Sequence, residues 1–353
     1  MDILVLEGDG IGPEICEATT GCLERMNREW NLGLSFPREA IGLASLKRHG
    51  TTLTDEVVEQ ACSAQGILLG PVSVADYPPA EQGGRNPSAE LRKRLDLYAN
   101  IRPSRTRPAV PALAKALDVV VVRENTEGFY ADRNMAAGPG EFMPTPDVAL
   151  AVRKITRSAS RRIAATAFRL AGSRRRLVTA AHKANVLHHT DGLFLEEVRQ
   201  VAREFPDVAL EDFHIDALAA HLVRRPERFD VLLTTNMFGD ILSSLSSELA
   251  GSQGIAAALN AGDAHAAAQA GHGSAPDLAG RGVGNPTGLL LSAAMLLDWM
   301  GERFGRPDLG RAGGRLNAAV EATLADPRDH TPDLGGRLGT QAFAGRVLER
   351  LFA

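Results

Sequence analysis

Residues 231–244 read VLLTTNMFGDILSS, and this stretch indicates the kind of fold to expect. An apolar, β-branched run breaks at Asn236 and Gly239 and places Asp240 at the start of a helical pattern. In open α/β sheets, ligands bind beyond the carboxyl ends of the strands, where such a junction of strand, loop and helix lies. Asp240 is therefore a candidate metal-binding or catalytic carboxylate, although a helix cap or a partner of the helix dipole would stand at the same place.

Short apolar runs alternate with longer helical patterns along the rest of the chain. The expected strands are Ile3–Leu6, Gly66–Leu69, Val119–Val122, Leu177–Ala180 and Val231–Thr235. The expected helices include Gly12–Arg28, Pro146–Ala171, Asp191–Glu204 and the Ala-rich segments Ser292–Met300 and Arg315–Leu324. This alternation predicts an α/β protein with an at least partly parallel sheet. The Gly- and Pro-rich residues Asn134–Pro146 interrupt the pattern and are either a surface excursion or a subunit-contact arm.

Length and charge restrict the class of protein further. With 353 residues, of which 44% are hydrophobic, the chain exceeds the size at which one core stops growing, so two lobes are expected. The net charge is −4 and no basic stripe with interleaved aromatic residues occurs, which argues against a nucleic-acid partner. The arginine clusters at 161–162 and 174–176 are expected to be solvated helix faces.

The cysteines and the lengths of the apolar runs indicate the cellular compartment. The three cysteines, Cys16, Cys22 and Cys62, have no paired metal spacing and imply reduced thiols rather than disulfides. Met1–Leu6 runs straight into a strand-like stretch without a basic leader, and no apolar run reaches about 18 residues. We therefore expect a cytoplasmic protein with no membrane partner.

Three arginines stand near predicted element ends. Arg92 lies in SAELRKRLDLYANIRP, Arg102 follows ten residues later, and Arg123 directly follows four valines. Three guanidiniums placed in this way could bind a substrate with several carboxylates through bidentate contacts, whereas the alternative is ordinary surface charge. Function is favoured for Arg123, because an unpaired guanidinium beside a buried strand would be costly to desolvate.

Other polar residues also follow predicted strands. Tyr130 ends RENTEGFY and could be an acid, a hydrogen-bond donor or the edge of a core. Lys183, in HKAN, is an amine whose pKa burial and neighbouring charge could lower. Asp216, in EDFHIDALAAH, is a second carboxylate upstream of Asp240, and hard oxygen donors of this kind suit Mg²⁺ or Mn²⁺.

Two glycine-containing segments are candidate loops at a ligand. GDGIGPE, residues 8–14, allows a tight turn after the first strand, but its spacing is neither a dinucleotide fingerprint nor a phosphate loop. HGSAPDLAGRGVGNP, residues 272–286, is a small-residue loop able to wrap around a nucleotide. His272 as a zinc ligand is disfavoured, because no Cys or His cluster accompanies it.

Eight motifs in collinear order carry a family resemblance, namely GDGIGPE, LDLYANIRP, VRENTEGFY, HKANVL, NMFGDILS, HGSAPD, GNPTG and TPDLGG. The chain resembles the β-decarboxylating dehydrogenases of isocitrate, homoisocitrate, isopropylmalate and tartrate, with motifs closest to the NAD-dependent homoisocitrate/isocitrate branch. The resemblance covers nearly the whole chain. It implies the two-domain α/β fold of isopropylmalate and isocitrate dehydrogenases, with a mixed, largely parallel sheet distinct from the Rossmann fold.

The resemblance also implies domains and an assembly. A large domain on the cofactor side would comprise residues 1–97 and 246–353, and a small central domain would comprise 98–245 with a dimer-contact arm at about 131–146. The protein would be a homodimer with shared active sites, either alone or within a larger assembly.

By the same resemblance, the reaction is oxidative decarboxylation of a 3-substituted malate to a 2-oxo acid, CO₂ and NADH. Arg92, Arg102 and Arg123 would clamp the carboxylates of this hydroxy polycarboxylate. Asp240, with Asp216 from the partner subunit, would hold Mg²⁺ or Mn²⁺, which would polarise the carbonyl of the β-keto acid. The catalytic residues would be Lys183, also from the partner, which would help take the hydroxyl proton on carbon 2, and Tyr130, which would direct protonation at carbon 3.

The cofactor-binding residues carried over are His272, Gly273, Ser274, Ala275, Asp277, Asn285 and Asn185. Asp277 would lie against the adenosine ribose, where a carboxylate accepts hydrogen bonds from a 2′-hydroxyl and repels a 2′-phosphate. NAD is therefore predicted rather than NADP.

The substrate's variable group would be read by residues 85–89, RNPSA. Isopropylmalate enzymes place leucines there, whereas Arg85, Asn86 and Ser88 could meet a polar or anionic group, so an isocitrate- or homoisocitrate-like substrate is preferred. The alternatives are an isopropylmalate dehydrogenase, a tartrate/malate-type or specialised enzyme, and a non-catalytic regulatory subunit. Two usual carboxylates are replaced, by Ser244 one helical turn beyond Asp240 and by Gln269 before His272.

Overall fold

The computed structural model describes residues 1–130 and 135–353, which form two compact units. Unit 1 comprises Met1–Leu95, Arg107–Ala112 and Gly251–Ala353, and unit 2 comprises Asp96–Thr106 and Leu113–Ala250. Residues 107–112, which the sequence placed in the central domain, belong to unit 1, where Val110 joins the hydrophobic core. The assignment of the two parts as a cofactor domain and a domain with a subunit-contact arm stays a prediction.

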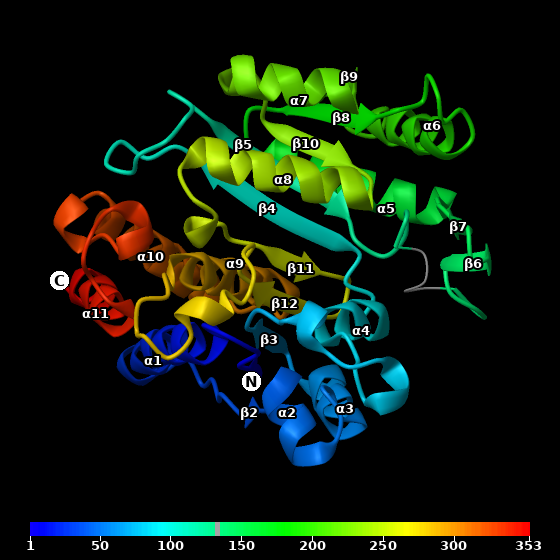
Figure 1. Ribbon diagram of the computed structural model, residues 1–353. Helices are drawn as coiled ribbons and strands as arrows, with labels where there is room; N and C mark the ends of the chain where they lie inside the picture. Colours follow the sequence, from blue (N-terminus) through cyan, green and yellow to red (C-terminus); the bar gives the residue numbers. More distant parts are fainter. Residues whose placement is uncertain (131–134) are drawn as a thin grey trace. The chain divides into compact units, whose positions relative to one another are not determined.

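In unit 1, the strands are ordered β2-β1-β3-β12-β11 (Figure 1). They are β1 (Ile3–Leu6), β2 (Arg38–Glu39), β3 (Gly66–Leu69), β11 (Leu259–Ala261) and β12 (Ala266–Gln269). All neighbours are parallel except β11 and β12. The helices are α1 (Gly12–Trp30), α2 (Gly42–His49), α3 (Asp55–Ser63), α4 (Pro87–Arg94), α9 (Thr287–Arg303), α10 (Pro307–Leu324) and α11 (Thr340–Leu351).

Strand β1 is buried on both of its faces. Ile3 and Val5 join a core built with residues of α1, α9, α10 and α11, while Leu4 and Leu6 point to the other face and are also buried. A strand covered on both faces reads as a continuous apolar run, as parallel strands usually do. The expected strands at 3–6 and 66–69 are confirmed with the same bounds.

In unit 2, the strands are ordered β4-β5-β10-β8-β9, and only the β4/β5 pair is antiparallel. They are β4 (Ala99–Arg105), β5 (Asp118–Glu124), β8 (Leu177–His182), β9 (Ala209–His214) and β10 (Val231–Thr234). The helices are α5 (Arg157–Gly172), α6 (Thr190–Ala202), α7 (Ile215–Arg224) and α8 (Asn236–Ala250), and a separate two-stranded sheet pairs β6 (Glu141–Thr145) with β7 (Val148–Ala151).

The four valines of β5 divide between two cores. Val120 and Val122 pack with residues of α5 and α6, whereas Val119 and Val121 pack with residues of α7 and α8. Helices therefore cover both faces of this strand, and the backbone leads directly from a buried core to Arg123 at its carboxyl end.

One predicted helix is wrong in its first part. The helix expected over Pro146–Ala171 begins only at Arg157, because Thr156 caps it by accepting a hydrogen bond from the Ala159 backbone N–H at 3.2 Å. Residues 148–151, within the expected helix, instead form strand β7. This strand pairs with β6, which lies in the stretch 134–146 that was expected to lack regular structure. Of the proposed contact arm, residues 131–134 lie outside the described residues.

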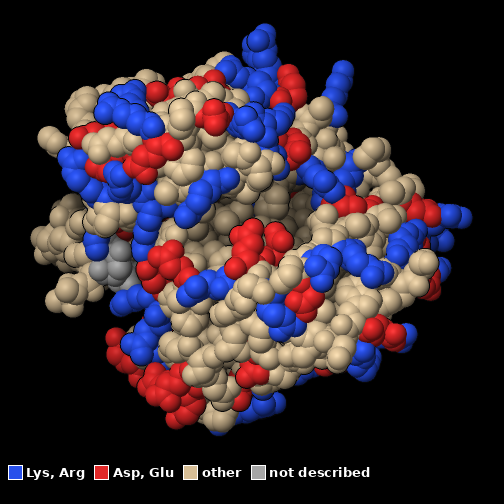
Figure 2. Space-filling view, turned by 180° about the vertical axis from the view of Figure 1, so that it is seen from behind, with Lys and Arg blue, Asp and Glu red and all other residues tan. Residues whose placement is uncertain are grey.

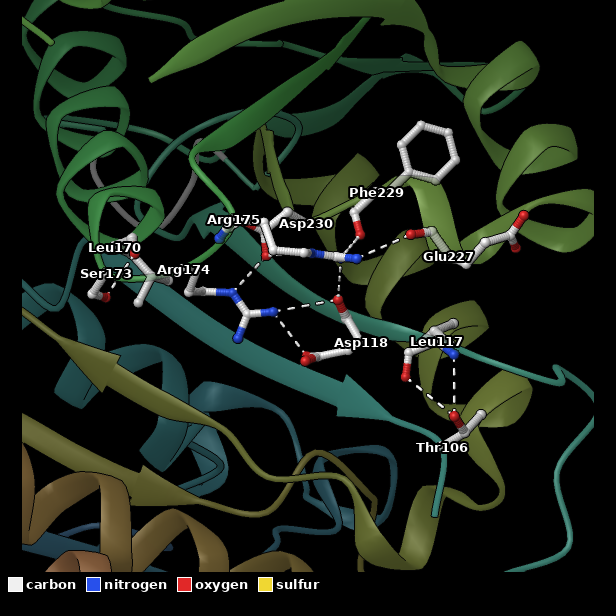
Figure 3. A network of polar contacts seen from close by, with 10 residues as sticks. All are labelled: Thr106, Leu117, Asp118, Leu170, Ser173, Arg174, Arg175, Glu227, Phe229 and Asp230. Carbon is white, nitrogen blue, oxygen red and sulfur yellow. Dashed lines mark hydrogen bonds and ion pairs between the residues drawn. The ribbon is translucent and has the colours of Figure 1, made fainter. Parts of the chain in front are cut away.

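The arginine cluster at 174–176 is more than a solvated face (Figure 3). Arg174 donates from Nε to Asp230 at 2.7 Å and from Nη2 to Asp118 at 2.8 Å, and the Arg175 backbone N–H donates to Asp230 at 2.8 Å. Asp230 is fully buried beside the start of β10. The cluster therefore joins the segment after α5 to the amino ends of β5 and β10, and the prediction of simple solvation is corrected, since a buried carboxylate requires these donors.

The surface shows no dominant sign of charge on the face drawn in Figure 2, where Lys and Arg are interspersed with Asp and Glu. No helix in the described parts of the chain is long and apolar enough to cross a membrane. The three cysteines are free thiols, and Cys16 and Cys22 are buried.

Candidate active site

Three of the predicted residues meet in unit 2. Arg123 ends β5, Arg102 lies on the neighbouring β4, and Asp240 lies in the second turn of α8. One carboxylate oxygen of Asp240 accepts from Nη1 of Arg123 and lies 3.4 Å from Nη1 of Arg102. Asp240 therefore pairs with two guanidiniums and does not cap the helix that contains it.

Gly239 and Asn236 determine how Arg123 reaches Asp240. A Cβ on Gly239 would lie 2.6 Å from Cβ and Cγ of Arg123, so the arginine stem passes α8 only because this residue is glycine. Nε of Arg123 donates to the Asn236 side-chain oxygen at 2.8 Å, and the Asn236 amide donates to the backbone oxygen of Glu127, also at 2.8 Å. From the sequence, Asn236 was interpreted only as the residue that ends the apolar run, so its role in orienting Arg123 was not predicted.

Arg102 has hydrogen-bonding capacity left over. Its Nη1 donates to the Ser243 hydroxyl at 2.9 Å, while its buried Nε has no partner among the residues that the structure describes. Burial lowers the pKa of Arg102 because the charged form is desolvated. Two guanidiniums therefore lie close together beside the Asp240 carboxylate, an arrangement that suits an anionic ligand.

Ser243 was also missed, although helical spacing could have found it. Asp240, Ser243 and Ser247 lie three and seven residues apart and so share one face of α8. Ser243 contacts Arg102, and the Ser247 hydroxyl lies 3.4 Å from that of Ser104 on β4. This face carries the polar contacts to β4, while the consequence of Ser244 for a metal stays a prediction.

Lys183 and Asp216 form a second pair in unit 2. Lys183 follows β8, Asp216 lies in the first turn of α7, and Nζ of the lysine donates to the carboxylate. The lysine lowers the pKa of the exposed Asp216. The Lys183 backbone N–H donates at 2.6 Å to the buried Asp191, whose other oxygen pairs with Arg153, so the residue that carries the amine is firmly held.

Asp240 and Asp216 are the candidate metal ligands. Among the described residues, no group of three or more His, Cys, Asp or Glu side chains could hold a metal ion. Asp240 and Asp216 have the hard oxygens that suit Mg²⁺ or Mn²⁺, but each is engaged in its own ion pair. The donor chemistry therefore fits such an ion, whereas completing its coordination requires oxygens from substrate or from a second copy of the chain.

The end of β5 and the turn that follows it hold two buried carboxyl groups that were not singled out from the sequence. Glu124 accepts hydrogen bonds from the Thr126 hydroxyl and backbone and from the Glu127 backbone. Glu127 accepts from the Thr156 backbone and hydroxyl, both at 2.9 Å, and burial raises its pKa to about 7. Tyr130, the predicted acid, is half-buried at the end of this turn.

A cavity of about 240 Å³ lies in unit 1 beside the predicted nucleotide segment. Of the predicted cofactor residues, it is lined by His272, Gly273, Ala275 and Asn285, together with other residues that include Ile11 and Asp333. Asp333 was not singled out in TPDLGG, yet its carboxylate accepts from the Asn285 amide at 3.0 Å. Burial lowers the pKa of His272, which favours a neutral ring.

The remaining cofactor residues lie in other surroundings. Ser274 is buried, Asp277 is exposed in the short 3₁₀ helix Pro276–Leu278, and Asn185 is exposed in unit 2. None of these three lines the cavity. The loop is held by Glu14, whose carboxylate accepts from the backbone N–H groups of Gly282 and Gly284.

Helix α4 carries the residues predicted to read the substrate. Asn86 caps it by accepting from the Ala89 backbone N–H at 3.1 Å, which explains the helix start without a ligand. Ser88 is buried, and its hydroxyl accepts from the Gln269 side chain at 2.8 Å. Arg92 lies one turn further along, on the same side of the helix.

The comparisons with known proteins agree over nearly the whole chain. A family model described as isocitrate/isopropylmalate dehydrogenase matches residues 2–347. Isocitrate/homoisocitrate dehydrogenase of Thermus thermophilus is 44% identical over 352 residues, which cover 99% of this chain and 98% of the relative. The chain belongs to the isocitrate/isopropylmalate dehydrogenase family. Another relative, 3-isopropylmalate dehydrogenase of Methanothermobacter thermautotrophicus, is 39% identical with the same coverage.

Solved structures give the same fold. Isocitrate dehydrogenase from Methylococcus capsulatus matches with a TM-score of 0.87 at 36% identity, covering 100% of this chain and 99% of that chain. The family resemblance and the fold expected from the motifs are confirmed, and the protein is an oxidoreductase that acts on a hydroxy acid. The relatives' names differ in substrate, so family membership alone does not select one.

Proposed function

We propose that the protein catalyses the NAD- and divalent-metal-dependent oxidative decarboxylation of a 3-substituted malate with a polar or carboxylate side group. The products are a 2-oxo acid, CO₂ and NADH. The observation that carries this proposal is the pairing of the partly buried Arg102 and the buried Arg123 with the carboxylate of Asp240, which stays accessible to solvent. Such a site is suited to a substrate that brings carboxylates of its own.

The proposed chemistry assigns one task to each side chain. Arg102 and Arg123 bind substrate carboxylates, and Arg92 is the third guanidinium of the set. Bound NAD⁺ would supply the acceptor for the hydride from carbon 2, and Lys183 of a second copy accepts the hydroxyl proton. The bond between carbon 3 and its carboxylate then breaks, CO₂ leaves, and Tyr130 directs protonation of carbon 3. A divalent ion held by Asp240 and by Asp216 of a second copy would supply Lewis acidity at the carbon 2 oxygen.

The substrate assignment is supported by residues 85–89. Ser88 is bonded to an amide and lacks the apolar character that a branched hydrocarbon substituent needs. The test is NADH formation with isocitrate, homoisocitrate, 3-isopropylmalate, tartrate and malate in the presence of Mn²⁺. We expect the highest kcat/KM for isocitrate or homoisocitrate, and a clear preference for isopropylmalate would overturn the assignment.

The isopropylmalate alternative keeps support from the relative that is 39% identical over the whole chain. The regulatory-subunit alternative would be favoured only by purified protein that binds NAD yet oxidises none of these acids.

The preference for NAD rests on Asp277. Its exposed carboxylate, in the loop that borders the cavity, would repel a 2′-phosphate. We expect kcat/KM for NAD to exceed that for NADP by at least tenfold, and Asp277→Asn to reduce this ratio. Comparable values for the two cofactors in the unaltered protein would contradict the proposal.

A homodimer is part of the proposal, because Lys183 and Asp216 are assigned to the partner's active site. Support comes from β6 and β7, where Phe142, Met143, Val148 and Leu150 are exposed. A two-stranded sheet with this much exposed apolar surface is marginal alone and is stabilised by a second surface. The cytoplasmic location inferred from the thiols is part of the same proposal.

A further inference from the structure

Asp9 lies at the centre of a buried hydrogen-bond network in unit 1. It follows β1 within GDGIGPE and is almost fully buried. One carboxylate oxygen accepts from the Leu43 backbone N–H at 2.7 Å, and the other accepts from the Ser73 backbone N–H at 2.9 Å and from the Tyr77 hydroxyl. Two segments distant in sequence, around Leu43 and around Ser73–Tyr77, are thus held by one side chain, which the catalytic proposal does not use.

The network continues from Ser73 to the loop beside the cavity. The Ser73 hydroxyl lies 2.7 Å from the Ser274 hydroxyl, and both are buried. The Ser274 carbonyl accepts from the Ile11 backbone N–H at 2.8 Å. A Cβ on Gly10 would overlap that carbonyl, so the turn beside Asp9 packs directly on the loop. Ser274 therefore has two contacts, and both come from segments joined to Asp9.

The backbone conformation of Ala275, the residue after Ser274, shows how the hydrogen bonds of Ser274 restrain the loop. Ala275 has φ +40°, a left-handed conformation that non-glycine residues seldom adopt. Ala275 lines the cavity with His272 and Gly273, while Ser274 points into the protein. Such a conformation persists when the surroundings fix it, and the contacts of Ser274 supply that restraint.

We propose that Asp9 and Ser73 are positioning residues that hold the loop 272–275 in the shape required by the adenine dinucleotide. They act through Ser274 and do not touch the cofactor. The inference rests on the proposed function for the identity of the ligand. It assigns to GDGIGPE the task of supporting the nucleotide loop, in place of a direct phosphate contact.

The test measures NAD binding without a hydroxy acid, by fluorescence titration of Ser73→Ala, Ser274→Ala and the double variant. Each single variant is expected to raise the Kd for NAD about fivefold to tenfold, the effect of losing one buried hydrogen bond. The double variant should be no worse than the weaker binder of the two, because both lose the same contact. For Ser73→Ala at saturating NAD, kcat should stay within twofold, and Ser73→Thr should restore most of the affinity.

Ser45→Ala is the matched control, because Ser45 is a buried serine of the same unit whose hydroxyl has no partner among the described residues. It should leave the Kd unchanged. Unaltered Kd values in folded Ser73→Ala, or additive effects in the double variant, would overturn the inference. If the unaltered protein binds neither NAD nor NADP, the proposed function itself fails, and that outcome is distinct from these.

Asp9→Asn extends the test to the centre of the network. It leaves one carbonyl oxygen where the carboxylate receives three donors, so the rise in Kd should exceed that of Ser73→Ala. Tyr77→Phe removes only the phenol contact and keeps the Ser73 backbone bond, so its Kd should change less than twofold. If Tyr77→Phe weakens binding as much as Asp9→Asn, the path through Ser73 is wrong.

Discussion

At the scale of single residues, Gly239 determines the position of the buried Arg123 guanidinium. We predict that Gly239→Ala displaces the Arg123 stem, because the added Cβ would lie 2.6 Å from it. A misplacement of this size next to reacting groups can cost on the order of 100-fold in rate, so kcat/KM for the preferred acid should fall by at least tenfold. Gly192→Ala, in α6 where an added Cβ meets nothing within 4 Å, should leave kinetics unchanged, and equal effects of the two would contradict the prediction.

Glu127 should give the protein a pH-dependent stability. Burial raises its pKa from 4.5 to about 7, with the nearby Glu124 adding to the shift and Lys154 and the Thr156 contacts opposing it. Between these pH values the folded chain binds more protons than the unfolded chain, so the free energy of unfolding falls as pH rises. Between pH 4.5 and 7.5, the free energy of unfolding measured in urea should therefore fall by roughly 3 kcal/mol less in Glu127→Gln than in the unaltered protein. An equal pH dependence in both proteins, or the same change in the exposed-site control Glu204→Gln, would disprove it.

At the scale of elements, the network around Asp230 fastens α5 to the strands of unit 2. Asp230→Asn leaves the Arg174 guanidinium without its buried carboxylate, so we predict a loss of about 3 kcal/mol in unfolding free energy. Asp118→Asn is the matched control, since Asp118 contacts the same guanidinium from a largely exposed position and should cost about 1 kcal/mol or less. Similar losses would show that burial of the carboxylate does not determine the effect.

The hairpin of β6 and β7 should determine the oligomeric state. Phe142 and Leu150 are paired across the two strands and both are exposed, so placing glutamates at both positions would bring two charges into an apolar contact. We predict a shift from dimer to monomer for Phe142→Glu/Leu150→Glu, read by light scattering. Leu113→Glu, at an exposed leucine outside the hairpin, should stay dimeric. A double variant that remains a dimer would remove the hairpin from the interface.

Strands and helices differ in how well local pattern predicts them. The buried strands β1, β3, β5, β8 and β10 were identifiable because apolar runs bounded by turns have few alternatives, whereas the buried strands β11 and β12 were not predicted. The helix at 146–171 was extended too far because β7 is also apolar, and only its pairing with β6 shows that it is a strand. Of the site residues, Arg123 and Asp240 were predictable because they follow expected strands, whereas Arg102 lies within β4, which was not predicted. The structure brings the three into contact. Asn236 and Asp333 were missed because their contacts come from segments distant in sequence, whereas Ser243 could have been found from its helical spacing to Asp240.

At the scale of the whole molecule, the proposal separates nucleotide binding from metal binding. The cavity lies in unit 1, while Asp240 and Asp216 lie in unit 2. We predict that removing divalent ions with EDTA abolishes NADH formation but leaves the Kd for NAD within twofold. Restoring Mn²⁺ should restore turnover. Loss of NAD affinity on chelation, or full turnover without a metal, would contradict this division.

The threading of the chain has a consequence for synthesis on the ribosome. Unit 2 is complete once residue 250 has emerged, whereas unit 1 needs residues from both sides of it. Strand β12, which pairs with β3, is made about 200 residues after its neighbour. The early strands β1 and β3 must therefore wait with one edge unpaired while the middle of the chain folds, and an unpaired apolar edge is prone to aggregation. Nascent chains halted near residue 250 should accordingly be the species that depends most on chaperones.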